Sequence, residues 1–213
     1  MAFKDRYDGG KQLVERLTKY KGDKDALVLG LARGGVITAS AVAAGLHLPL
    51  NVVVVRKIGA PGEEELALGA IAETGEGIFN EHLISLLGVS SDYLKREIEK
   101  QKNIVKVRLS RYRSNCPASE LKGKTVILVD DGIATGASMR VAIQWAKSEG
   151  AKKIVLAVPV AAPDSLKSME KEVDEVVCLF SPVYFEAVGS FYKFFDQTED
   201  AEIIRLLSSS NQR

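Results

Sequence analysis

The sequence predicts an α/β fold built on a mostly parallel sheet. Short apolar runs rich in β-branched residues alternate with helical patterns between residues 26 and 180, the order that right-handed crossovers require. Polar or glycine-bearing loops follow three of these runs, and sheets of this class bind ligands at the carboxyl ends of their strands. The 213 residues are expected to form one domain, with a core over about 26–180, a helical insertion over about 80–119 and a hood or tail over about 181–213.

The spacing of apolar residues and the positions of turn residues locate the individual helices and strands. Buried strands are expected where four or more apolar residues run together between turn signals, and helices where apolar residues recur every three or four positions. The strands are expected at residues 26–31, 51–55, 126–129, 153–158 and 175–180, with one running back at 67–73. The helices are expected at residues 8–20, 36–44, 81–87, 91–113, 139–147, 164–171 and about 198–207.

Composition is that of a soluble globular protein, with 46% hydrophobic and 27% charged residues and a net charge of +1. This charge argues neither for nor against a nucleic-acid partner. Cys116 and Cys178 are far apart in sequence, which fits a reducing compartment and provides no metal framework. Residues 1–5 lack the apolar core of a signal peptide, and no run is long enough to span a bilayer, so a cytoplasmic location is expected.

The first candidate site follows the strand at 126–129, where Asp130 and Asp131 stand side by side. Small and hydroxylated residues then open a helix, and free N–H groups at a helix start suit a phosphate. Carboxylates at a strand end can accept hydrogen bonds from sugar hydroxyls or hold a hydrated cation. Together these features predict a ribose 5-phosphate site, although ordinary helix capping would also explain them. The loop consists of Ala134, Thr135, Gly136, Ala137 and Ser138.

Two further loops follow the strands at 26–31 and 51–55. The first is a candidate anion loop, or alternatively a plain β–α turn with a surface arginine. The second begins with Arg56 and Lys57, and the proline, glycines and acids of residues 60–66 predict an exposed, mobile segment. A mobile segment with cations at its root suits a lid over a reacting phosphate. The first loop consists of Ala32, Arg33, Gly34 and Gly35.

The order of these motifs resembles the type I phosphoribosyltransferase family, whose phosphoribosyl pyrophosphate (PRPP) motif is similar to VILVDDGIATGAS. LARGG looks like the family's pyrophosphate loop, and R-K-x-G is similar to the start of the catalytic loop in adenine phosphoribosyltransferases. The resemblance covers about residues 26–160. It implies a Rossmann-like sheet, Mg²⁺ as cofactor, a homodimer, and displacement of pyrophosphate from PRPP by a nitrogen base.

The resemblance also implies roles for these residues. Asp130 and Asp131 would bind the ribose hydroxyls and, through water, Mg²⁺; residues 134–138 would hold the 5-phosphate. Residues 32–35, with Arg56 and Lys57, would receive the pyrophosphate, and a cis peptide is expected near Ala32-Arg33. Ala137 replaces a usual glycine, which would narrow the room for the phosphate.

Glu73 lies where adenine phosphoribosyltransferases have a glutamate that faces the purine, whereas the hypoxanthine–guanine enzymes have an aspartate at the position of Ala134. The resemblance therefore favours a purine acceptor, with Glu73 exchanging a proton with the base. The alternative interpretation of Glu73 is a surface acid that flanks a turn.

The insertion and the tail fit the family least. Residues 91–113 carry an apolar stripe and a basic face, which we interpret as an amphipathic helix covering the core or a subunit contact. A nucleic-acid surface is the alternative interpretation of the basic face. The tail holds many aromatic residues, which are more often core than platforms for a base. The stripe consists of Leu94, Ile98, Val105, Leu109 and Tyr112.

The function predicted from these residues is phosphoribosyl transfer from PRPP to a nitrogen base, without nucleic-acid or membrane partners. One alternative is a non-catalytic PRPP or nucleotide sensor that binds nucleic acid through the basic helix. Another is a hydrolase of phosphosugars that uses the same pocket.

Overall fold

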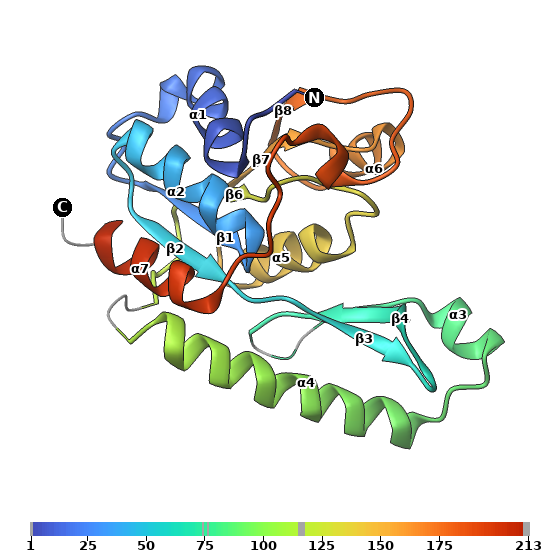
Figure 1. Ribbon diagram of the computed structural model, residues 1–213. Helices are drawn as coiled ribbons and strands as arrows, with labels where there is room; N and C mark the ends of the chain where they lie inside the picture. The colour runs from blue at the N-terminus through green and yellow to red at the C-terminus, as the bar shows by residue number, and fades with distance from the viewer. Residues whose placement is uncertain (1, 74, 76, 115–117, 211–213) are drawn as a thin grey trace.

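The computed structural model describes residues 2–73, 75, 77–114 and 118–210. Its centre is a five-stranded sheet in the order β2-β1-β6-β7-β8, in which all neighbouring strands are parallel. The parallel α/β sheet predicted from the sequence is thus confirmed (Figure 1). Its strands are β1 (Ala26–Leu31), β2 (Leu50–Val53), β6 (Thr125–Val129), β7 (Lys153–Val160) and β8 (Glu175–Phe180).

Helices cover both faces of this sheet. One face packs against α1 (Arg6–Arg16), α2 (Gly34–Leu46) and α7 (Asp200–Ser210). The other face packs against α5 (Ala137–Ser148) and α6 (Pro163–Met169). The helix predicted over 8–20 is divided, since α1 ends at Arg16 and a 3₁₀ turn, η1 (Thr18–Tyr20), follows it.

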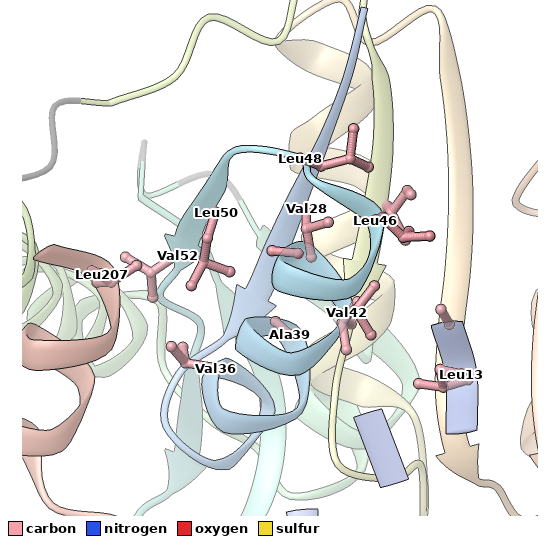
Figure 2. Packing of buried hydrophobic residues seen from close by; sticks show 14 of the residues in the cluster. Leu13, Val28, Val36, Ala39, Val42, Leu46, Leu48, Leu50, Val52 and Leu207 are labelled. Carbon is pink, nitrogen blue, oxygen red and sulfur yellow. The ribbon is translucent and has the colours of Figure 1, made fainter. Parts of the chain in front are cut away.

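Each strand of the sheet is apolar on both faces because helices lie on both sides. In β1, Val28 packs with Leu13 and Val42 in one layer, while Leu29 packs with Leu128 in the other. Figure 2 shows the first layer, where Val28 lies between side chains of α2, β2 and α1. The continuous apolar runs of the sequence thus reflect burial on two sides.

The segment predicted to be a mobile loop is instead part of a β-hairpin. β3 (Arg56–Ala60) and β4 (Glu63–Ile71) are antiparallel, and β5 (Gly77–Phe79) extends them to a three-stranded sheet. The predicted loop over 60–66 is shortened to an exposed turn at Pro61-Gly62, because Ile58 and Leu68, both fully buried, anchor the strands on either side of it. The mobility of this tip stays a prediction. The return strand is confirmed in direction, although it begins at Glu63 rather than at residue 67.

Two helices pack against this hairpin, and together they form an arm beneath the parallel sheet (Figure 1). They are α3 (Glu81–Leu86) and α4 (Ser91–Tyr112), close to their predicted bounds, and the Ser90 hydroxyl accepts the N-cap bond from Tyr93 N–H. Leu94 and Ile98 pack on the hairpin. Val105 and Tyr112, further along the stripe, join the core of the parallel sheet, so α4 connects the two sheets.

The tail after β8 forms a small aromatic cluster with the N-terminal segment. Phe3 and Tyr192 lie at its centre, next to η2 (Val188–Phe191). Most of these rings are packed against one another as core, whereas the Tyr184 side chain is 90% exposed. Across the described residues, we find no helix with the length and hydropathy to span a membrane.

Candidate active site at the carboxyl edge of the sheet

The two predicted ligand loops meet at the carboxyl edge because β1 and β6 are parallel neighbours, with Gly30 paired to Val129. The contact between the loops is close. A Cβ atom added to Gly34 would lie 2.1 Å from Asp131 Oδ2, and one added to Gly35 would lie 2.7 Å from Asp130 Oδ1. Glycine is therefore required at both positions so that the start of α2 can approach the two carboxylates.

Two helices begin at this edge without a side-chain cap. α2 starts directly after the Ala32-Arg33 peptide, which is cis as expected, and α5 starts after Gly136, whose φ is 76°. Uncapped N–H groups at a helix start form an anion site. Ala137 is the first residue of α5 and has helical backbone angles. Helical angles do not require glycine, so alanine can replace the family's usual glycine at this position.

Residues 134–138, the phosphate loop, are fixed by β7 and α6. Ile133 N–H donates to the Val160 carbonyl, and the Ala134 carbonyl accepts a bond from the Ser165 hydroxyl. Thr135 is exposed and Ser138 partly exposed, so their hydroxyls are accessible to a ligand.

The paired carboxylates create the strongest electrostatic feature of the site. Burial, and secondly the charge of Asp131, raises the pKa of Asp130 well above its ordinary value. Burial also raises the pKa of Asp131, but Arg6 opposes that effect. The Arg6 guanidinium donates from Nε to Asp131 Oδ2 at 2.6 Å and from Nη1 to the Asp196 carbonyl at 2.7 Å, and it lies 3.7 Å from the centre of the Phe195 ring.

Sequence reasoning missed Arg6 and Tyr192. Arg6 begins an amphipathic helix far from the motifs in sequence, and nothing around it distinguishes it from other surface cations. The Tyr192 hydroxyl donates to the Asp131 carbonyl, and burial raises its pKa. The aromatic tail was noticed, but no local pattern indicated which ring would reach the site.

The donor set at this edge is compatible with the expected Mg²⁺. Mg²⁺ takes one or two carboxylates, keeps several waters and shares substrate oxygens. Asp130 and Asp131 supply two such carboxylates next to the phosphate loop. They form a pair only, since no group of three or more His, Cys, Asp or Glu side chains that could hold a metal ion occurs in the part of the chain that the structure describes.

Arg56 and Lys57 line a cavity of about 680 Å³ that also reaches Ser138, in the first turn of α5. The structure therefore brings the cations of β3 next to Ser138, while their expected role with residues 32–35 toward pyrophosphate stays a prediction. The far wall belongs to α4, which the sequence did not assign to the site. Its contribution consists of Tyr93, Glu97, Lys100 and Gln101.

Glu73 is held by Arg113, the C-cap residue that follows α4. Two guanidinium nitrogens of Arg113 donate to the two carboxylate oxygens at 2.8 Å each, and one of them also donates to the Val52 carbonyl at 3.2 Å. Burial raises the pKa of Glu73, and Arg113 opposes this effect. Glu73 is therefore not a simple surface acid, and its role toward a base stays a prediction.

A family model described as the phosphoribosyl transferase domain matches residues 3–192. The chain belongs to the phosphoribosyl transferase domain family. The motifs that resembled this family in the sequence lie together at one edge of the sheet. Family membership confirms the fold class predicted from them.

Several known proteins are similar to this phosphoribosyl transferase domain. A Mycobacterium tuberculosis protein, named provisionally as a phosphoribosyl transferase, is 42% identical over 99% of this chain and 47% of its own length. The chain thus spans about half the length of these curated relatives. The crystal structure of a Thermus thermophilus protein is 41% identical, with a TM-score of 0.83 over 98% of this chain and 99% of that one. A ribose-phosphate pyrophosphokinase of Sulfolobus acidocaldarius is 42% identical over 32% of this chain and 22% of its own length.

The two neighbouring aspartates should respond to Asn substitution in opposite directions. Asp130→Asn should raise the free energy of unfolding at pH 7 by about 1 kcal/mol, because it removes a buried charge next to another. Asp131→Asn should lower it by about 2 kcal/mol, because Arg6 loses its counter-charge. Urea denaturation of both variants measures this.

The pH dependence provides a further check. A raised carboxyl pKa means that the folded state binds more protons, so wild-type stability falls as pH rises from the ordinary aspartate value toward the raised one. The gain in the free energy of unfolding that Asp130→Asn gives over wild type should therefore shrink as pH falls toward about 4. A variant less stable than wild type at pH 7 would contradict this account of Asp130.

The ion pair of Glu73 predicts a cost for Glu73→Gln of about 2 kcal/mol in the free energy of unfolding, because Arg113 keeps a mostly buried charge. Glu172→Gln is the matched control. Its pair with Arg140 is about 30% exposed on both sides, compared with 11% for Glu73 and 18% for Arg113, and its loss should cost less than about 1 kcal/mol. Equal costs in chemical denaturation would show that the Glu73 pair contributes no more than a surface pair.

Proposed function

We propose that this chain transfers the phosphoribosyl group of PRPP to a nitrogen base with release of pyrophosphate. The observation that carries the proposal is the convergence of two uncapped helix starts and two adjacent carboxylates at one edge of the sheet. PRPP has a matching set of groups, with a phosphate at one end, a diphosphate at the other and a diol between them.

Each loop then has one task. Asp130 and Asp131 accept hydrogen bonds from the ribose hydroxyls, and residues 134–138 hold the 5-phosphate at the start of α5. Residues 32–35, with Arg56 and Lys57, receive the pyrophosphate. When bound, Mg²⁺ would neutralise charge on the pyrophosphate, held through water by Asp130 and Asp131.

The same residues favour the transition state. As the bond from C1 to the pyrophosphate oxygen breaks, its electron pair leaves with pyrophosphate and the sugar becomes oxocarbenium-like. A base nitrogen forms the new bond at C1 and loses its proton, for which the Glu73 carboxylate is the proposed acceptor. The fixed carboxylates of Asp130 and Asp131 stabilise the cationic sugar, and the cations of β3 stabilise the departing anion. Transfer to the base rather than to water requires that the bound base excludes water from C1.

We propose a purine as the acceptor, with Glu73 as the residue that faces it. Both carboxylate oxygens of Glu73 already accept bonds from Arg113, so a base N–H would use their remaining lone pairs. The proposal includes a cytoplasmic location and a homodimer, supported by the cysteine usage and by the resemblance to the family, respectively.

Loss of both carboxylates should abolish the sugar site. The double variant Asp130→Asn with Asp131→Asn should bind PRPP at least about 100-fold more weakly, because charge-assisted hydrogen bonds to two hydroxyls are lost. Titration calorimetry measures the affinity, and circular dichroism verifies that the fold persists. Asp23→Asn, outside the site, is the control, and unchanged affinity in the double variant would sink the sugar-site assignment.

The activity itself is tested by pyrophosphate release from PRPP and Mg²⁺ across a panel of purine and pyrimidine bases. Turnover with a purine is the expected outcome. PRPP binding without turnover on any base would instead support the non-catalytic sensor. Release of ribose 5-phosphate without a base would support the hydrolase.

A further inference from the structure

Gln101 breaks the apolar stripe of α4. The stripe passes through Leu94, Ile98 and Val105, and the position between Ile98 and Val105 that continues it is occupied by a glutamine. The side chain is not turned to solvent, since Gln101 is only 6% exposed. A buried amide costs free energy unless both of its ends are hydrogen-bonded, so an apolar residue would serve packing better here.

Both ends of the Gln101 amide have partners. Oε1 accepts a hydrogen bond from Arg56 Nε at 2.9 Å, and Nε2 donates to Glu97 Oε1 at 2.7 Å. The amide therefore holds the guanidinium of a β3 residue in one orientation, and Glu97 in turn fixes the amide. Such a part-buried network, with a partner at each end of the amide, restricts its members to few geometries.

The cavity beside this network suits a compact polyanion. Arg56 and Lys57 come from β3 and Lys100 from α4, and all three line the cavity that reaches Ser138 at the start of α5. Lys100 pairs with Glu97 at 3.3 Å, and its side chain is 56% exposed, so its ammonium can reach an anion in the opening. Among the lining side chains that the structure describes, three cations therefore face one carboxylate, Glu97, which is already shared by Lys100 and Gln101.

We infer that α4 is part of the active site and that Gln101 is a positioning residue, which holds Arg56 where it meets the departing pyrophosphate. Lys100 adds a further cation to the same subsite. This inference rests on the proposed transferase function and assigns the inserted helix a part in it. Gln101 acts through Arg56 and does not itself contact the sugar.

The test compares two ligands that occupy different parts of the site. In Gln101→Met, which keeps the length of the side chain, inorganic pyrophosphate should bind about tenfold more weakly, because Arg56 loses its fixed orientation. Ribose 5-phosphate, held by residues 130–138, should bind within about twofold of wild type. If Gln101 had a purely structural role, Gln101→Met would lower the affinity for both ligands by the same factor. Calorimetry on the full chain measures both affinities, and Gln101→Leu replaces Gln101→Met if the latter does not fold.

A double-mutant cycle isolates the contact between the two residues. If Gln101 acts through Arg56, adding Gln101→Met to Arg56→Met should change pyrophosphate affinity no further. Leu94→Ala is the control for α4 packing, since it loosens the helix on the hairpin away from Arg56, and it should leave pyrophosphate affinity unchanged.

The outcomes separate this inference from the function that it rests on. Four results would each overturn the role of Gln101. Gln101→Met could bind pyrophosphate as tightly as wild type, or it could lose affinity for pyrophosphate and ribose 5-phosphate equally. The effects in the double-mutant cycle could be additive, or the wild-type protein could fail to bind pyrophosphate. Absence of PRPP binding and turnover in wild type, with a selective loss of pyrophosphate in Gln101→Met, would overturn the transferase proposal and leave the anion subsite supported.

Discussion

The structure depends most on one constraint, which is that Asp130 and Asp131 lie side by side and mostly withdrawn from solvent at the end of β6. Two adjacent carboxylates in such a place repel each other and lose hydration, so their surroundings must supply compensation. Arg6 provides a counter-charge, and the segment that holds Phe195 and Asp196 fixes the Arg6 guanidinium in turn. The two ends of the described chain are thereby connected to its centre, and a site that costs stability determines where the N-terminal helix and the tail must pack.

The arm formed by the β3–β5 sheet, α3 and α4 places cations opposite the phosphate loop. β2 ends beside β1, with Val53 paired to Leu31, so the chain leaves the sheet at the ligand-binding edge before it forms the hairpin. Packing of Ile58 on α4 and the ion pair of Arg113 with Glu73 then fix the arm to the sheet. The cations of β3 are therefore held by folded structure rather than by the ordering of a loop.

How much of this could be predicted depends on the range of the interaction. The parallel sheet, the loops at its edge and the bounds of β8 and α4 follow from local patterns of apolar residues, and the sequence predicted them. The hairpin was missed because its Pro61-Gly62 turn and nearby acids suggested a loop, while the buried side chains that define the strands are few. Arg6 and Tyr192 were missed because their partners are more than 60 residues away in sequence, and no local rule connects such positions.

Gln101 shows that one signal for such a distant contact is present in the sequence. The helical period of α4 assigns this position to the buried face, and a buried polar residue requires partners that the helix alone does not supply. Glu97 is one turn away and satisfies the amide N–H, so the carbonyl needs a donor from another element, and β3 supplies Arg56. A polar residue within an apolar stripe therefore points to a contact between the inserted helix and another element, even where family motifs do not reach the helix.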